Sequence, residues 1–328
     1  MTTNFQPVRT NATAPVAYPS SPFARDVLKG LGMQQKTLPC KYLYDETGSK
    51  IFEQICDLDD YYLTRTEADI FADNIPQMAA VLRPEAALIE PGAGNCEKAQ
   101  PLLAAMQEPH GYFPMDISSE ILLAAQSRIE AAIPGLRVTP MVSDFADIDA
   151  WQPLKDTTQS AAQRVIFFPG STIGNFTPVQ AQHLMDLFAS ILQPGDGLLL
   201  GADLVKDSVV LERAYCDSEH VTEAFNKNLL ARINAELQAD FDLDNFAHRA
   251  FYHGLRQRVE MHLVSLKEQS VRVAGQQIQF REGETIHTEN SHKYTHQRLE
   301  QLFAGANFHP VQYWTDTDNH YAVYYALY

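Results

Sequence analysis

The sequence predicts an α/β fold with a doubly wound, mainly parallel sheet and a second, smaller α+β unit. Short apolar runs alternate with helical patterns between residues 86 and 204, as they do when each strand is followed by a crossing helix. Several runs end in an acidic residue or a glycine turn, which is where α/β sheets bind ligands. The alternation stops after residue 205, so a different arrangement is expected there.

The segment before the sheet is expected to contain two helices. A short helix is predicted over 21–31, and turns are predicted over 41–66, where aromatic residues mix with Asp and Gly. Thr64 is placed to cap a longer helix over 67–82, which ends before Pro84.

Alternating strands and helices make up the predicted sheet. Apolar runs of strand length indicate strands that are buried on both faces, as parallel strands are. The expected strands are 86–90, 111–115, 136–142, 164–168 and 197–204, and the expected helices are 97–106, 118–132 and 178–192.

In the last third of the chain, the predicted strands and helices no longer alternate one by one. Residues 206–238 are predicted to form two helices, and 253–280 is expected to be rich in strands. A helix over 294–303 precedes two strands, 308–314 and 321–328, which we expect to pair as an antiparallel hairpin. Such a hairpin at the end of a parallel sheet is typical of methyltransferases that use S-adenosylmethionine (SAM).

Composition limits the classes of function. With 41 acidic and 25 basic residues, the chain has a formal charge of −16, which would repel the phosphates of a nucleic acid. No apolar run approaches the roughly 20 residues of a membrane span, and residues 1–21 lack the apolar stretch of a signal peptide. The four cysteines are far apart, which indicates neither a metal site nor a disulfide framework. We therefore expect a cytoplasmic protein with no metal, no nucleic-acid partner and no membrane association.

A glycine turn follows the first strand of the predicted sheet. It runs from Glu90 through Gly92 and Gly94 to Lys98, near the start of a helical pattern. Glycine lets the backbone approach a ligand, and a helix N-terminus offers free N–H groups. The third glycine of a dinucleotide site is missing, so the spacing favours the looser turn that binds SAM. A plain strand-to-helix turn would have the same pattern.

Residues at the ends of the next two strands indicate which nucleotide-like ligand the sheet binds. Asp116 follows the second strand, where a carboxylate can accept hydrogen bonds from ribose hydroxyls. Asp144 and Phe145 follow the third strand, where an acid can bind the adenine amino group and a ring can pack on the base. Each acid alone could be a turn former or a helix cap. Their order after successive strands favours a SAM site.

Seven further blocks lie outside the glycine turn, at 44–49, 61–67, 170–175, 201–207, 222–228, 241–246 and 289–291. Together they resemble the histidine-specific Nα-methyltransferases of ergothioneine biosynthesis. The resemblance extends from about residue 37 to the C-terminus, which is nearly the whole chain.

The resemblance implies a class I SAM-dependent methyltransferase with a Rossmann-like sheet. A SAM-binding domain would comprise 66–204 and 294–328, a substrate-binding domain would comprise 22–65 and 205–293, and residues 1–21 would be a flexible arm. The implied activity is three successive methylations of the α-amine of L-histidine, with SAM as co-substrate and hercynine as product. The protein is expected to act on this small molecule as a monomer.

The resemblance also implies roles for individual residues. Glu289 and Ser291 lie two apart, so on an extended strand they would face the same side and could read the two imidazole nitrogens. Tyr44 and Asn175 would lie nearest the reacting amine. The implied SAM contacts are Gly92, Gly94, Lys98, Asp116, Asp144 and Phe145, and the implied substrate contacts are Tyr61, Asn175, Tyr215, Met261, Glu289 and Ser291, with Phe225 beside Met261.

Two other functions are left open by the sequence. The same chemistry could act on a thiolated histidine or an indole amino acid, because a fold does not determine its substrate. An indole offers one donor and no acceptor, so Glu289 and Ser291 favour imidazole. Alternatively, the chain could be a regulator that binds SAM without catalysis.

Overall fold

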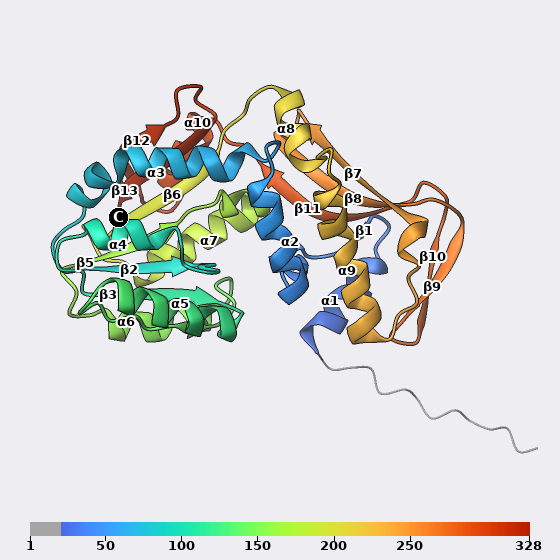
Figure 1. The fold of residues 1–328 in the computed structure, drawn as a ribbon, viewed down its shortest axis with the longest axis horizontal. Coiled ribbons are helices and arrows are strands. Elements are labelled where there is room, and N and C mark those ends of the chain that lie inside the picture. Colours follow the sequence, from blue (N-terminus) through green and yellow to red (C-terminus); the bar gives the residue numbers. More distant parts are fainter. Residues whose placement is uncertain (1–20) are drawn as a thin grey trace, which may run out of the picture.

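The computed structural model describes residues 21–328, which form two main sheets with helices around them (Figure 1). The flexible arm expected over 1–21 lies outside the described residues except for Ser21. The hydroxyl of Ser21 caps the first helix by accepting from the Ala24 N–H at 3.2 Å. None of the helices in the described range is long and apolar enough to cross a membrane.

A seven-stranded sheet forms the larger half of the fold. Strands β2 to β6 run parallel, whereas β13 pairs antiparallel with both β6 and β12. The strand order reverses between β2 and β5, so the sheet is doubly wound and ends in the expected hairpin, which confirms the predicted fold class. In spatial order the strands are β12 (His309–Thr315), β13 (Tyr321–Leu327), β6 (Gly197–Asp203), β5 (Gln163–Phe168), β2 (Ala86–Pro91), β3 (Gly111–Asp116) and β4 (Met141–Val142).

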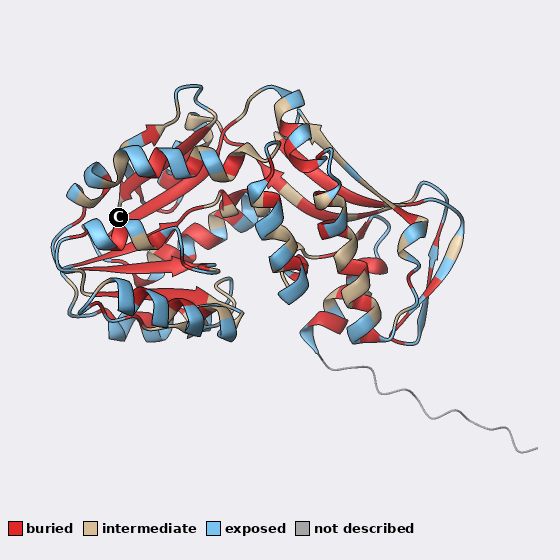
Figure 2. Cartoon of the chain, in the orientation of Figure 1, coloured by how far each residue is buried: buried red, intermediate tan, exposed pale blue. Residues whose placement is uncertain are grey.

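Helices cover both faces of this sheet. Because successive strand residues face opposite sides, Leu88 joins the core on one face and Ile89 joins the core on the other. Figure 2 shows the central strands buried and the exposed surface on the outer sides of the helices. The first face is covered by α3 (Tyr62–Ala80), α4 (Ala99–Ala105) and α5 (Ser119–Ala132), and the second by α6 (Gln152–Thr157), α7 (Pro178–Ile191) and α10 (His296–Gly305).

A second unit has its own core, which draws residues from 23–63 and 211–286. We propose that the boundaries between the two units fall near residues 66, 205 and 294. The sheet of this unit has the order β1 (Lys36–Thr37), β11 (Thr285–His292), β8 (Arg258–Ser265), β7 (Phe246–His253), and β9 (Gln269–Val273) pairs with β10 (Gln276–Phe280). Its helices are α1 (Pro22–Leu31), α2 (Glu46–Asp57), α8 (Ser208–Tyr215) and α9 (Val221–Leu237).

Two predictions about the chain before and within the sheet are wrong. The strand expected over 136–142 is reduced to Met141–Val142, because Pro140 has no N–H to donate to a neighbouring strand. The helix predicted over 67–82 begins at Tyr62, so Thr64 lies inside it instead of capping it.

A third prediction fails at α2, which occupies a segment where turns are expected. Asp45 accepts from the Gly48 N–H at 2.7 Å and so caps this helix. An Asp that opens a helix and an Asp that closes a turn bond nearby backbone N–H groups in similar ways, so the local pattern does not distinguish them.

Candidate active site

The glycine turn after β2 forms a cradle against the end of β3. Gly92 and Gly94 have positive φ angles of 69° and 52°. The Gly92 N–H donates to the Met115 carbonyl at 2.8 Å, and the Gly94 N–H donates to Oδ2 of Asp116 at 3.0 Å. Oδ1 of Asp116 accepts from the Ser118 N–H at 3.0 Å. Each carboxylate oxygen of Asp116 therefore keeps a lone pair for a ligand hydroxyl.

The loop after β4 closes this cradle. A Cβ at Gly92 would lie 3.2 Å from the Phe145 ring. Beside that ring, Oδ2 of Asp144 accepts from the ammonium of Lys41 at 3.2 Å, and Lys41 belongs to the 3₁₀ helix η1 (Cys40–Leu43) of the second unit. Gly92, Asp116 and Phe145 thus meet at the carboxyl ends of neighbouring parallel strands. The cradle, its carboxylates and its aromatic ring suit the adenosine part of SAM.

Gly92→Ala tests whether the cradle must stay open. The added methyl group would press on Phe145 at an unfavourable φ of 69°, so we expect SAM affinity to fall about tenfold. Calorimetric titration with SAM measures this loss. Gly135→Ala is the matched control, because Gly135 also has a positive φ but no atom within 4 Å of the added methyl. It should lose about 1 kcal/mol of stability and keep its SAM affinity, and equal affinity losses in both variants would argue against the cradle.

Lys98 is held in place by a buried carboxylate. The sequence pattern does not indicate this group. Glu67 on α3 is 2% exposed, and its Oε2 accepts from the Lys98 ammonium at 2.5 Å. Its Oε1 accepts from the Gly170 N–H and from the Tyr321 hydroxyl, both at 2.6 Å. Glu67 therefore connects the helix after the glycine turn to the loop after β5 and to β13.

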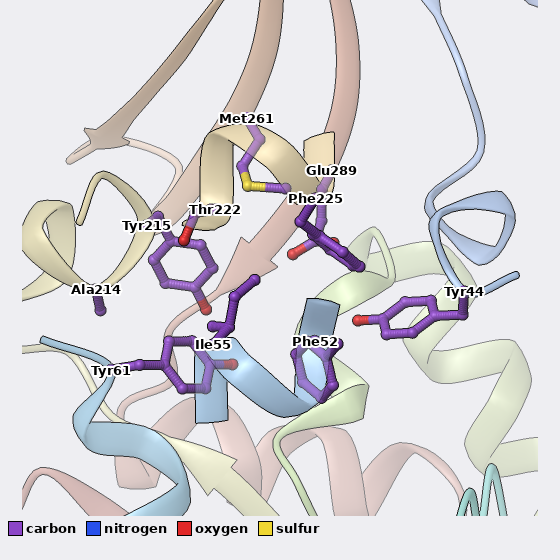
Figure 3. Close-up of a pocket in the computed structure, with 10 residues that line it drawn as sticks. All are labelled: Tyr44, Phe52, Ile55, Tyr61, Ala214, Tyr215, Thr222, Phe225, Met261 and Glu289. Atoms are coloured by element: carbon purple, nitrogen blue, oxygen red, sulfur yellow. The ribbon is translucent and has the colours of Figure 1, made fainter. Parts of the chain in front are cut away.

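A second cavity, with about 250 Å³ of empty space, lies in the second unit (Figure 3). The hydroxyls of Tyr44 and Tyr61 point toward its middle from opposite sides, and the carboxylate of Glu289 is directed into it. Phe52 and Ile55 are not among the predicted site residues. Both lie on α2, a helix that the sequence does not predict. The complete lining is Tyr44, Phe52, Ile55, Tyr61, Ala214, Tyr215, Thr222, Phe225, Met261 and Glu289. We call this cavity the acceptor pocket.

Glu289 is a buried carboxyl group with an unsatisfied oxygen in the acceptor pocket. The residue is 8% exposed, and its Oε2 makes no hydrogen bond with any residue of the described range. Burial raises the pKa of Glu289 to about 7, although the Lys293 ammonium acts to lower it. A buried polar atom without a partner costs free energy, which a ligand that donates a hydrogen bond would recover.

Glu289→Gln should stabilise the ligand-free protein at neutral pH and above. Because the folded-state pKa of about 7 exceeds the usual 4.5, ionisation of the wild-type carboxyl group opposes folding as pH rises from 4.5 to 7. At pH values above the folded-state pKa, ionisation of Glu289 costs about 3 kcal/mol of folding free energy. Urea unfolding should show the smallest difference between the two proteins at low pH and a more stable variant in the alkaline range. A variant that is less stable there would contradict the unpaired buried carboxylate.

A buried lysine lies next to the acceptor pocket. Lys293 is 0% exposed, and its ammonium donates to Oδ2 of Asp203 at 2.7 Å, to Oγ of Ser291 at 2.9 Å and to the Tyr215 hydroxyl at 3.0 Å. Asp203 also pairs with Lys206. Burial acts to raise the pKa of Asp203, but the two ammonium groups outweigh burial and hold this pKa below its usual value.

This network limits what the two hydroxyls can offer to a ligand. Oγ of Ser291 and the hydroxyl oxygen of Tyr215 are 2.7 Å apart, so one of them donates to the other. An ammonium only donates, so both oxygens accept from Lys293. One hydroxyl hydrogen of the pair is then left for a ligand. With Glu289 ionised, Glu289 and the Ser291–Tyr215 pair present one acceptor and one donor, in addition to the hydroxyls of Tyr44, Tyr61 and Thr222 that line the pocket.

Like Ser291, Asn175 is a predicted site residue that does not line the acceptor pocket. It ends the 3₁₀ helix η3 (Thr172–Asn175), which packs against β11. A Cβ at Gly174 would lie 2.8 Å from the His292 carbonyl oxygen, so this close approach requires glycine. The structure therefore places Asn175 beside the strand that contains Glu289 and Ser291.

Two clusters within residues 21–328 could each offer three ligand atoms to a metal ion, and neither lines the acceptor pocket. In one of them, Arg258 donates to Glu260 at 2.6 Å, and the rings of His262 and His287 are stacked with their centroids 4.8 Å apart. Oε1 of Glu260 is thus already engaged by Arg258, and its Oε2 lies 3.1 Å from Nε2 of His262. The expectation of no metal stays a prediction. The clusters are Glu260, His262 and His287, and Asp316, Asp318 and His320.

Similarity to known proteins extends over both units of the fold. Residues 23–327 match the family described as "Histidine-specific methyltransferase, SAM-dependent". The chain is 40% identical to a histidine N-alpha-methyltransferase of Mycolicibacterium smegmatis and 38% identical to one of Mycobacterium tuberculosis, each over 89% of this chain and 90% of the relative. It is 23% identical to the N-methyltransferase fsqC of Aspergillus fumigatus, over 90% of this chain and 81% of that protein.

Proposed function

Because the chain belongs to the histidine-specific, SAM-dependent methyltransferases, we propose that it transfers three methyl groups from SAM to the α-amine of L-histidine. The product would be the trimethylated betaine hercynine. The cradle beside Gly92 would hold SAM, and the acceptor pocket would hold the amino acid. Support comes from the family match, from the relatives and from the donor and acceptor groups of the pocket.

The observation that supports histidine most strongly is the pairing of one acceptor with one donor. A neutral imidazole has one N–H and one bare nitrogen. Glu289 would accept from the N–H, and the hydroxyl hydrogen left free by Ser291 and Tyr215 would be donated to the bare nitrogen. Glu289, the free hydroxyl hydrogen and both ring nitrogens would then each have a hydrogen-bond partner.

The residues of the cradle fit the methyl donor. Gly92 leaves space beside the Phe145 ring, and Asp116 keeps lone pairs for the ribose hydroxyls. When bound, SAM supplies an electrophilic methyl group on a sulfonium, so the protein does not need a nucleophile of its own.

The contribution of the protein is to align the amine and exclude water. An ammonium group has no lone pair, so the amine must lose a proton before each transfer. Burial raises the pKa of Tyr44 and Tyr61 well above the usual value, so both hydroxyls stay protonated and act as neutral hydrogen-bonding groups. We assign Tyr44 and Asn175 to the amine. The aromatic lining would keep water away from the reacting atoms.

A screen of free amino acids with methyl-labelled SAM, read by mass spectrometry, tests this proposal. Histidine should give mono-, di- and trimethylated products. Preferred methylation of an indole amino acid would support the alternative acceptor. Binding of SAM without methylation of any amino acid would instead indicate a regulator.

A further inference from the structure

A second hollow lies near β11 and is separate from the acceptor pocket. Side chains alternate along a strand, so His292 faces away from the side that presents Glu289 and Ser291. The hollow has about 730 Å³ of empty space and opens to solvent. It is lined by the first residue of α7, the turn between β7 and β8, and residues of β8, β11 and α10, namely Pro178, Leu255, Arg256, Gln257, Arg258, His292 and Arg298.

The lining of this hollow is cationic although the chain is acidic. Three arginines and no acidic residue appear among its described lining residues, whereas the whole chain has 41 acidic and 25 basic residues. Nε of Arg258 donates to Glu260 at 2.8 Å, and Arg298 donates to Oε1 of Gln257 at 2.8 Å. The side chain of Arg256 is 60% exposed and lies 3.7 Å from Glu260. The carboxylate of Glu260 therefore pairs with two of the three guanidinium groups, Arg256 and Arg258, and the three arginines together keep a net positive charge.

His292 supplies an independent sign of a ligand. It is 3% exposed, and neither ring nitrogen has a hydrogen-bond partner within the described part of the chain. The backbone of Arg256 approaches the ring without forming a hydrogen bond of normal geometry. Burial, together with the charges of Arg258, Arg298 and Lys293, lowers the pKa of His292 to about 4. The ring is therefore neutral at physiological pH and has one N–H to donate.

We propose that this hollow binds a small oxyanion of the phosphate class through Arg256, Arg298 and the ring N–H of His292. Guanidinium groups donate paired hydrogen bonds to phosphate oxygens, and their charge excludes a cation from the same place. The proposal is independent of which amino acid is methylated. The site is separate from the SAM cradle, but it lies behind β11 and next to η3, the elements that contain Ser291 and Asn175.

The test follows the His292 imidazole by NMR in the full-length protein. Its resonance is identified by its absence in His292→Gln. Inorganic phosphate and glycerol 3-phosphate are titrated separately, with chloride at equal ionic strength as the reference. We expect a saturable shift with a phosphate and a rise in the pKa of His292, because a bound dianion stabilises the protonated ring. The same shift with chloride, or no saturable shift with either phosphate, would overturn the proposal.

Matched arginine variants locate the site. Arg256→Gln should weaken phosphate binding about tenfold. Arg272→Gln is the control, because Arg272 is 66% exposed and its ion pair with Asp240 spans 3.9 Å, and it should leave phosphate affinity unchanged. Equal losses in both variants, or no loss in Arg256→Gln, would overturn the assignment. Tighter binding of glycerol 3-phosphate supports a phosphomonoester as the ligand, and tighter binding of inorganic phosphate supports the free ion.

Discussion

Glu289→Leu is expected to lower kcat/KM for histidine about 100-fold and to leave SAM affinity within about twofold of the wild type. Leucine occupies a similar space but cannot accept from the imidazole N–H, so the substrate would bury an unpaired donor. The SAM cradle does not include Glu289. Steady-state kinetics with histidine and a separate titration with SAM measure the two effects independently.

Glu289→Gln is the matched control for that variant. Glutamine keeps the shape and one neutral acceptor oxygen, so we expect a smaller loss of about tenfold in kcat/KM. Unchanged histidine turnover in Glu289→Leu would mean that this carboxylate does not read the ring. A parallel loss of SAM affinity would instead indicate a wider structural change.

Asp203→Ala is expected to reduce the free energy of unfolding by about 3–5 kcal/mol. Asp203 is 0% exposed and pairs with the ammonium groups of Lys293 and Lys206. Its removal would leave both positive charges buried without a counter-charge. Urea unfolding at neutral pH measures the loss, and stability close to that of the wild type would contradict the buried network.

A double variant separates the charge balance from the role of Lys293 in the acceptor pocket. Asp203→Asn combined with Lys293→Met removes one charge of each sign, so it should recover part of the stability lost in Asp203→Asn alone. In the wild type, burial lowers the pKa of Lys206 to about 8 although Asp203 acts to raise it, so Lys206 can lose its proton at small cost once Asp203 is replaced. Histidine turnover should not recover, because Lys293 no longer orients Ser291 and Tyr215. Recovery of turnover would show that Lys293 does not contribute to binding of the imidazole ring of histidine.

The central strands are predictable because burial on both faces makes each one an unbroken apolar run. The run over 164–168 corresponds to β5, which spans Gln163–Phe168. At the edge of the sheet the same reasoning fails for 136–142, because Pro140 interrupts the backbone hydrogen bonds. Helix α2 is not predicted because Asp45, which caps it, resembles a turn-forming Asp in the sequence, and only the structure shows that the segment packs against α9.

The two parts of the candidate site differ in how much the sequence reveals. Asp116 and Phe145 can be proposed because parallel strands bring their carboxyl ends together, so order along the chain indicates position in space. The pair of Asp203 and Lys293 joins distant parts of the chain, and each residue alone looks like an ordinary charged group. A local pattern does not reveal that a lysine is 0% exposed, so only the three-dimensional structure identifies the network beside Ser291.

The position of the methyl groups on histidine tests the central claim most directly. Histidine is incubated with SAM that contains a ¹³C-labelled methyl group, and the product is examined by NMR. The proposed function predicts a single labelled methyl resonance, from a trimethylammonium group on the α-carbon. The imidazole ring should be unmodified. Methyl groups on a ring nitrogen, or unmodified histidine under conditions in which another amino acid is methylated, would contradict it.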